Sequence, residues 1–177
     1  MRCAGVEPSV ATFVFEDDGS IPNSPMPLLL YRGALDLALA DPAAAFEQRF
    51  ARHRWTGGWR NGIYPFHHYH STSHEVLGIA RGRATVRFGG ANGTSVEVEA
   101  GDAVVIPAGV GHKNEGASDD LLVVGAYPDG CDYDLCRGRP EERDHALRNI
   151  QRVPLPATDP LFGMQGPLVS HWRADAA

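Results

Sequence analysis

The sequence has little positive charge and no long apolar run. Lysine and arginine together number 16 against 22 aspartates and glutamates, which gives a formal net charge of −6. A nucleic-acid-binding surface needs a basic patch, so this balance argues against nucleic acid as a partner. No apolar stretch approaches the roughly 18 residues that a transmembrane helix needs, and we therefore expect no membrane interaction.

Cysteine is also scarce, with three in the chain. An odd, low number of cysteines is typical of reduced thiols in a cytoplasm. Cys131 and Cys136 are separated by four residues, but one such pair without a second cannot form a zinc ribbon, so we interpret them as free thiols. Residues 1–7 contain an early acid and lack the apolar centre of a secretory signal. These features predict a cytoplasmic protein.

The chain of 177 residues shows no internal repeat and no second domain, so we predict a single domain over residues 1–177. Short apolar segments separated by glycine-rich turns favour an all-β sandwich or barrel. We place an N-terminal strand segment at residues 1–31 and the core barrel at residues 59–128.

Two helices are expected outside the barrel. One is predicted over residues 41–55, because Asp41 suits the N-cap, Pro42 suits the first helical position, and the following apolar residues share one face. The other begins at Pro140, and residues 129–177 are expected to consist of this helix and an extended, proline-rich arm.

Histidine is concentrated in one stretch: four of the eight histidines lie within residues 62–82. His68 and His70 are two apart, so on a strand their side chains share a face. His67 and Tyr69 then point the other way, and packing is their expected role. The spacing thus aims two imidazoles into one space.

A carboxylate and a further histidine complete the candidate site. Glu75 follows the first histidines after a turn, and two histidines with one carboxylate make a divalent-metal site with open positions. In a second block, residues 101–114, Pro107 ends a short strand and Gly109 permits a tight turn. His112 then enters the next strand as a fourth candidate ligand.

The two blocks resemble the paired motifs of the cupin superfamily. The first motif, G-x5-H-x-H-x(3,4)-E-x6-G, is matched at Gly62, His68, His70, Glu75 and Gly82. The second, G-x5-P-x-G-x2-H-x3-N, is matched at Gly101, Pro107, Gly109 and His112. Its last position departs from the motif, since Gly116 stands where asparagine is expected. Over residues 12–172 the chain is similar to the YjlB-like single-domain bacterial cupins.

This resemblance implies an all-β, double-stranded β-helix, the RmlC-like cupin jelly roll, with one or two flanking helices. It implies one divalent transition metal, Fe, Mn, Ni or Zn, held by His68, His70, Glu75 and His112. Three imidazoles and a carboxylate leave positions open for substrate, water or dioxygen. A homodimer is also implied, with residues 1–31 as a candidate for exchange onto a partner's sheet.

The expected function is that of a metal-dependent enzyme acting on a small-molecule substrate. A dioxygenase-type oxidoreductase is favoured, because two open positions suit dioxygen and a chelating substrate. The alternatives are a non-catalytic small-molecule-binding or sensing cupin and a sugar isomerase/epimerase-like cupin. No catalytic base is assigned, because such an assignment needs geometry.

Four further residues are pocket candidates. Tyr64 and Phe66 alternate in step with His68 and His70, so on a regular strand they would line the cavity. Phe66 is a candidate for the cavity wall. Tyr64 is a candidate substrate contact, although filling space is the simpler role for it. His74 is a candidate base next to the carboxylate, or a structural loop histidine. Lys113 is a candidate for attracting an anion at the mouth, or a solvated lysine.

Overall fold

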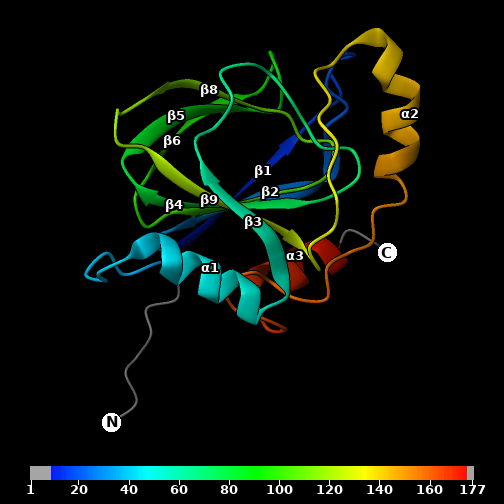
Figure 1. The fold of residues 1–177 in the computed structure, drawn as a ribbon. Helices are drawn as coiled ribbons and strands as arrows, with labels where there is room; N and C mark the ends of the chain where they lie inside the picture. Colours follow the sequence, from blue (N-terminus) through cyan, green and yellow to red (C-terminus); the bar gives the residue numbers. More distant parts are fainter. Residues whose placement is uncertain (1–8, 175–177) are drawn as a thin grey trace.

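The computed structural model describes residues 9–174, and within them nine strands form two antiparallel sheets that face each other (Figure 1). The strands are β1 (Ser9–Phe15), β2 (Ser24–Arg32), β3 (Trp55–Asn61), β4 (Glu75–Arg81), β5 (Arg83–Phe88), β6 (Thr94–Glu99), β7 (Ala103–Ile106), β8 (His112–Ala117) and β9 (Leu122–Pro128). The six-stranded sheet has the order β1-β2-β7-β4-β9-β3 and the three-stranded sheet the order β6-β5-β8. The predicted all-β, double-stranded β-helix is confirmed.

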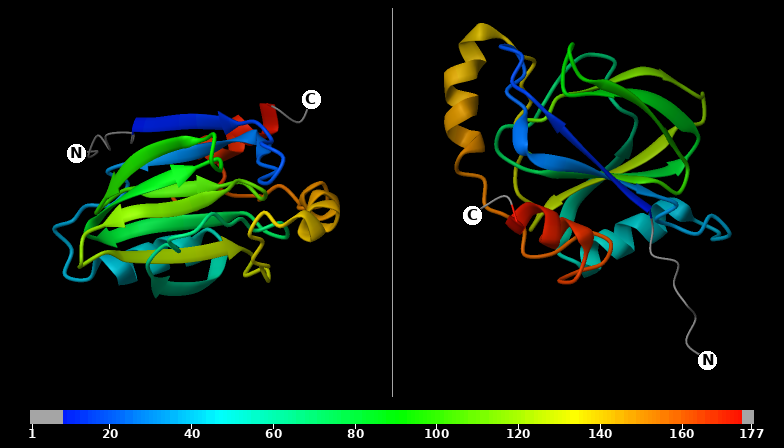
Figure 2. Two further views of the ribbon diagram at one scale, coloured as in Figure 1. Left: turned by 90° about the horizontal axis from the view of Figure 1, so that it is seen from above. Right: turned by 180° about the vertical axis from the view of Figure 1, so that it is seen from behind.

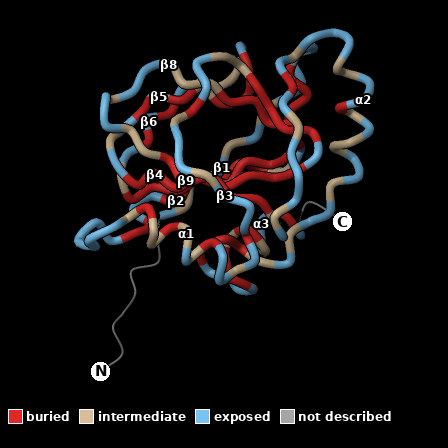
Figure 3. The backbone as a smooth tube through the Cα atoms, viewed as in Figure 1, coloured by how far each residue is buried: buried red, intermediate tan, exposed pale blue. Residues whose placement is uncertain are grey.

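The central strands of the six-stranded sheet, β2, β7, β4 and β9, are buried on both faces, and alternate residues along each of them point to opposite sides. Leu28 and Leu30 of β2 belong to an inner core between the two sheets. Leu29 and Tyr31 belong to an outer core between this sheet and the helices. Figure 3 shows the result as nearly continuous buried backbone along the central strands. The central strands are therefore packed against side chains on both of their faces.

Helix α1 (Pro42–Arg52) covers the outer face of the six-stranded sheet. Asp41 is its N-cap and accepts a hydrogen bond from Ala44 N at 3.0 Å. A Cβ at Gly78 of β4 would lie 2.7 Å from the ring of Phe46, so the helix packs this closely only because the strand has glycine there. The helix ends before the expected residue 55, since Arg54 adopts a positive φ of 67° and β3 begins directly afterwards.

The C-terminal part contains α2 (Pro140–Ile150) and α3 (Pro167–Ala174). The expected extended arm therefore ends in a helix that the sequence interpretation missed. Leu168 and Trp172 lie four apart on α3 and are buried, and Trp172 Nε1 donates to Pro27 O at 2.9 Å. Figure 2 shows α3 beside α1 on the same side of the barrel. None of the helices within residues 9–174 has the length and apolar character to cross a membrane.

The N-terminal strands are part of the barrel and do not precede it. Strand β2 pairs with β1 along its length, from Ser24 to Arg32, and with β7 only through Leu29 to Tyr31. Pro25 and Pro27 lie before the part that pairs with β7, so the N–H that proline lacks is not needed for a bond to that strand. The barrel thus extends beyond residues 59–128. Exchange of this segment in a homodimer stays a prediction, and residues 1–8 lie outside the described part.

The C-terminal segment is tied to the sheet by the buried carboxylate of Asp159. It accepts a hydrogen bond from Tyr31 Oη at 2.6 Å. It also accepts from the backbone N–H groups of Leu161, Phe162 and Leu168, at 2.8, 3.0 and 3.0 Å.

We expect Asp159→Ala to lower the free energy of unfolding by about 3 kcal/mol, because these buried donors lose their acceptor. Urea denaturation measures this loss. Asp119→Ala, at an exposed turn, is the control and should change stability by less than about 0.5 kcal/mol. Equal effects in both variants would contradict the anchoring role.

Candidate metal centre

Two of the four predicted ligands come from facing sheets. Glu75 opens β4 and shares the inward parity of Leu77 and Ile79, which lie in the inner core. His112 opens β8 and pairs with Phe88 of the same inner core. Both side chains are therefore directed into the space between the sheets, and both are buried.

His68 and His70 lie in the connection between β3 and β4 and not on a regular strand. Two isolated bridges replace the expected strand, one joining His68 to His112 and the other joining Tyr69 to Cys136. His68 N donates to His112 O at 3.2 Å, and His112 N donates to His68 O at 2.9 Å. The bridges preserve the alternation of a strand, so Tyr69 packs in a separate cluster with Ile21.

The three histidines share one hydrogen-bonding arrangement. In each ring Nδ1 faces a backbone carbonyl oxygen: Phe66 O at 3.0 Å for His68, Asp134 O for His70, and Val110 O at 3.3 Å for His112. A carbonyl oxygen only accepts, so the ring hydrogen sits on Nδ1. The neutral ring then presents the Nε2 lone pair, which is the orientation that metal-bound histidines adopt.

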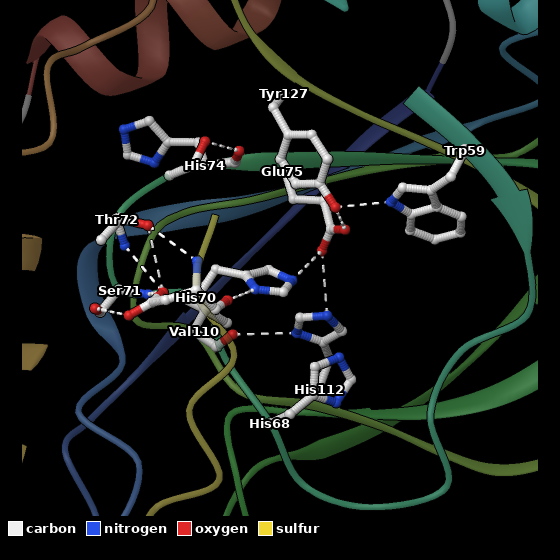
Figure 4. A network of polar contacts seen from close by, with 12 residues as sticks. Trp59, His68, His70, Ser71, Thr72, His74, Glu75, Val110, His112 and Tyr127 are labelled. Carbon is white, nitrogen blue, oxygen red and sulfur yellow. Dashed lines mark hydrogen bonds and ion pairs between the residues drawn. The ribbon is translucent and has the colours of Figure 1, made fainter. Parts of the chain in front are cut away.

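These electron-pair donors converge on one point. Ligand atoms of His68, His70 and His112 all lie within 4.8 Å of one another. Glu75 Oε2 lies 3.3 Å from Nε2 of His70 and 3.3 Å from Nε2 of His112 (Figure 4). Two donors bound to one ion at about 2.1 Å each stand about 3.0–3.4 Å apart. The spacings of Glu75 to His70 and to His112 fit a shared metal ion. The histidine group, which does not include Glu75, is compatible with the same ion.

The carboxylate supplies a separate test of that fit. Within the described residues, Glu75 Oε2 is buried and has no hydrogen-bond partner. A buried oxygen left in this way is costly, and a cation would satisfy it together with the three imidazole nitrogens. The donor set therefore fits a divalent transition metal and does not by itself distinguish Fe, Mn, Ni and Zn.

The electrostatics keep Glu75 charged and His68 neutral, which are the forms that bind a metal. Burial by itself raises the pKa of Glu75, but the attraction of the adjacent His70 and His112 rings holds it well below its usual range. Burial, reinforced by the neighbouring His112, lowers the pKa of His68 to about 3. Burial also opposes charge on His70, yet the carboxylate of Glu75 raises the pKa of that ring.

Tyr127 and Trp59 hold the carboxylate of Glu75 in place through a chain of hydrogen bonds. Tyr127 Oη donates to Glu75 Oε1 at 3.0 Å and accepts from Trp59 Nε1 at 2.7 Å. Burial and the charge of Glu75 raise the pKa of Tyr127, so it acts as a donor and not as a base. A Cβ at Gly125 would lie 2.3 Å from the indole of Trp59, so glycine there is what lets the indole reach Tyr127.

Residues 131–136, which we call the strap, orient His70 from outside the barrel. The Asp134 carbonyl accepts from His70 Nδ1, and its carboxylate accepts from Ser71 N at 2.6 Å and Ser71 Oγ at 2.5 Å. Burial opposes charge on Asp134, but the hydrogen bonds from Ser71 lower its pKa. Sequence reasoning missed this residue, because 63 positions separate it from Ser71.

A cavity of about 320 Å³ opens onto the four predicted ligands. It is lined by Trp59, Asn61, Gly62, Ile63, Tyr64, Pro65, His68, His70, Glu75, Leu77, His112, Tyr127, Tyr133 and Leu135. Tyr64 is thus the one pocket candidate among the lining residues of the described chain. Trp59, Tyr127 and Tyr133 were not proposed from the sequence, since they reach the cavity through strand register and long connections.

The other three pocket candidates lie elsewhere. Phe66 packs beneath the guanidinium of Arg137, whose Cζ lies 3.9 Å from the ring centroid. His74 is buried, and its Nδ1 accepts from Ala108 N at 2.9 Å. Figure 4 shows its ring directed away from the histidine cluster, which favours the structural role over a catalytic base. Lys113 follows His112 on β8 and so lies on the opposite face of that strand.

Comparison with known proteins agrees with these motifs. Residues 59–124 match the family described as Cupin domain. The uncharacterised protein YjlB of Bacillus subtilis (strain 168) is 46% identical over 169 residues, which are 94% of this chain and 99% of that protein. A DUF861 family structure from Thermotoga maritima is 20% identical, with 48% of this chain and 91% of that chain covered and a TM-score of 0.32. The acireductone dioxygenase structure from Bacillus anthracis, with a cadmium ion in its active centre, is 21% identical, covers 68% of this chain and 78% of its own, and has a TM-score of 0.36.

The strap generates a prediction about metal binding. Asp134→Ala removes the hydrogen bonds to Ser71, so the carbonyl that orients His70 loses its anchor. We expect metal affinity to fall about 10- to 100-fold, as for other residues that orient a metal ligand. Competition with a chromophoric chelator measures the affinity. Asp132→Ala is the matched control, because only the backbone carbonyl of Asp132 contacts the connection, at Thr72 Oγ1. Equal metal affinities in the two variants would show that the Asp134 carboxylate does not support metal binding.

Proposed function

The chain belongs to the cupin family, and on that premise we propose that it is a metal-dependent enzyme, a dioxygenase-type oxidoreductase acting on a small organic molecule. The observation that carries this proposal is the convergence of three imidazole Nε2 atoms with the unpartnered Glu75 Oε2. All four side chains line a cavity that leads to the surface. A metal held there would face the space that a substrate enters.

When bound, a transition metal would supply open coordination positions and, in the case of iron or manganese, redox chemistry. The residues of the chain would hold the ion, orient its ligands and shape the cavity. His68, His70, His112 and Glu75 would hold the ion, and Tyr127 orients Glu75 by donating a hydrogen bond to its Oε1. Leu77, Ile63 and Trp59 form an apolar part of the cavity wall. A dioxygenase places both oxygen atoms of O₂ in its organic substrate, so the reaction needs no separate reductant.

The cavity wall also bears on the sugar isomerase alternative. A sugar presents hydroxyl groups around its whole surface, and a site for it needs several side-chain donors and acceptors. Among the described lining residues beyond the four predicted ligands, such groups are Asn61, the three tyrosine hydroxyls and the Trp59 indole N–H. Two of these, on Tyr127 and Trp59, already bond to each other. This composition favours a less polar substrate.

The test is the metal content of protein purified without a chelator or a metal-affinity tag. We expect about one iron or manganese ion per chain, and His70→Ala should lose it because one Nε2 donor is gone. His67→Ala is the matched control. It removes a neighbouring imidazole that lies outside the ligand cluster, and it should retain the metal. The loaded protein should then consume oxygen with a suitable organic substrate, and His70→Ala should not.

Two results would contradict the proposal in different ways. Stoichiometric zinc, with no oxygen uptake after iron or manganese reconstitution, would favour isomerase or hydrolytic chemistry. Absence of metal in every preparation, reconstituted ones included, would make the chain a non-catalytic small-molecule-binding cupin.

A further inference from the structure

A cation lies at the edge of the cavity, outside the residues that line it. The Arg137 guanidinium covers the ring of Phe66, with its Cζ 3.9 Å from the ring centroid. Phe66 stacks in turn on Tyr64, with the centroids 4.9 Å apart, and Tyr64 lines the cavity. Arg137 is therefore connected to the opening by a stack of two aromatic rings. The metal site and its supporting hydrogen bonds give this residue no role.

The direction of the Arg137 side chain follows from the alternation of the strap that precedes it. Tyr133 and Leu135 line the cavity. Asp134 and Cys136 point the other way, the first into hydrogen bonds and the second into a separate apolar cluster. Alternate residues of an extended segment share a side, so Arg137 continues the side of Tyr133 and Leu135. It is thus the third side chain of one row along the mouth.

The backbone around Arg137 is fixed in two ways. Glu142 Oε2 accepts from Arg137 N at 2.8 Å and from Arg139 N at 3.0 Å. Directly before Arg137, Cys136 and Tyr69 exchange two backbone hydrogen bonds, both 2.9 Å long. Because the backbone is held and one face of the guanidinium rests on an aromatic ring, less conformational freedom is lost when a ligand binds to it.

The hydrogen-bond donors of this guanidinium are free. Stacking uses the flat face of the group, whereas its N–H groups point outward in the plane, where they match the two oxygens of a carboxylate. Within residues 9–174, no ion pair and no side-chain hydrogen bond occupies them, in contrast with Arg87 and Arg143, which are each paired with a carboxylate. An arginine that is stacked, held at its backbone and open to solvent is suited to bind an anion.

The surrounding charges favour an anion with a single negative charge. The strap carries two carboxylates, on Asp132 and Asp134, and one guanidinium cannot offset both charges of a phosphate beside them. None of the described lining residues is lysine or arginine, and part of the wall is apolar. The rest of the ligand, which lies in the cavity, is therefore best uncharged, since a buried charge without a partner is costly.

We propose that Arg137 is a specificity residue for the substrate: it binds a carboxylate at the rim of the cavity, while the uncharged and largely apolar body of the same molecule lies inside. The contact is made outside the barrel and does not involve the metal. The inference rests on the proposed function, because that function places the reacting end of the molecule in the cavity. It assigns the substrate to the small monocarboxylic acids, and it gives Arg137 the role that the sequence interpretation considered for Lys113.

The test compares hexanoate with hexanamide, which has the same length but no charge. Binding is followed by proton–nitrogen correlation NMR on protein loaded with zinc, which is diamagnetic and redox-inert, and the Nε–H signal of Arg137 is the local reporter. We expect hexanoate to bind about 3- to 10-fold more tightly than hexanamide and to shift that signal, because only the carboxylate pairs with the guanidinium.

Three variants make the test specific. Arg137→Gln should abolish the preference for hexanoate, and Arg137→Lys should recover part of it, since lysine keeps the charge and loses the planar fork. Arg139→Gln is the matched control. It removes the same charge two residues away, and its backbone N–H bonds to the same Glu142, but its side chain is not the one that covers Phe66. The control should keep the preference of the unaltered protein.

Equal effects of Arg137→Gln and Arg139→Gln, or no preference for hexanoate in the unaltered protein, would overturn the inference. A hexanoate preference that persists in Arg137→Gln would place the carboxylate at the metal and also contradict it. Tighter binding of hexyl phosphate than of hexanoate would contradict the substrate class. Failure of the proposed function shows separately, as absent metal or absent oxygen uptake. The same ratios are then measured on metal-free protein, where the preference should remain, because the ion takes no part in the contact.

Discussion

The site depends on where three hydrogen atoms reside. Each of the three ligand histidines gives its Nδ1–H to a backbone carbonyl, which leaves three Nε2 lone pairs and a carboxylate oxygen facing one another in a buried space. Such a group of acceptors, with no hydrogen between them, is unfavourable unless a cation occupies the centre. The carbonyls belong to three separate segments, at Phe66, Val110 and Asp134, so the orientation of the rings depends on the path of the whole chain.

The sheets make this arrangement rigid. Strands β4 and β9 carry Glu75 and Tyr127 on the inner face, while α1 covers their outer face. Gly78 lets Phe46 pack directly on β4, and Gly125 leaves room for the Trp59 indole across β9. Both glycines thereby bring an aromatic ring against the strands that support the carboxylate. Glu75 and Tyr127 are therefore held more firmly on these strands than side chains on a loop would be.

His68, His70 and His112 come together with Glu75 beside two of them, and short-range features of the sequence account for this placement, while their role as metal ligands stays a prediction. A two-residue spacing and two glycine turns set their directions even though the expected strand is reduced to isolated bridges. The fold class follows from the same turns and short apolar runs. Helix α3 was missed, since prolines around it obscured the pairing of Leu168 with Trp172. Tyr127, Tyr133 and Asp134 depend on register and on contacts between distant segments, which no local pattern encodes.

The strap joins two functions that are usually treated separately. Asp134 is tied to Ser71 and orients His70 through its carbonyl, whereas the preceding residue, Tyr133, forms one wall of the cavity mouth. Tyr133 and Leu135 are the two residues bonded to Asp134, so a backbone displacement at either one would also shift the carbonyl that orients His70, whereas a rotation of either side chain would not. The shape of the opening and the orientation of His70 are therefore coupled through the backbone of the strap. A change in substrate preference within this scaffold would be easier at Tyr64, which lines the same cavity from a different segment.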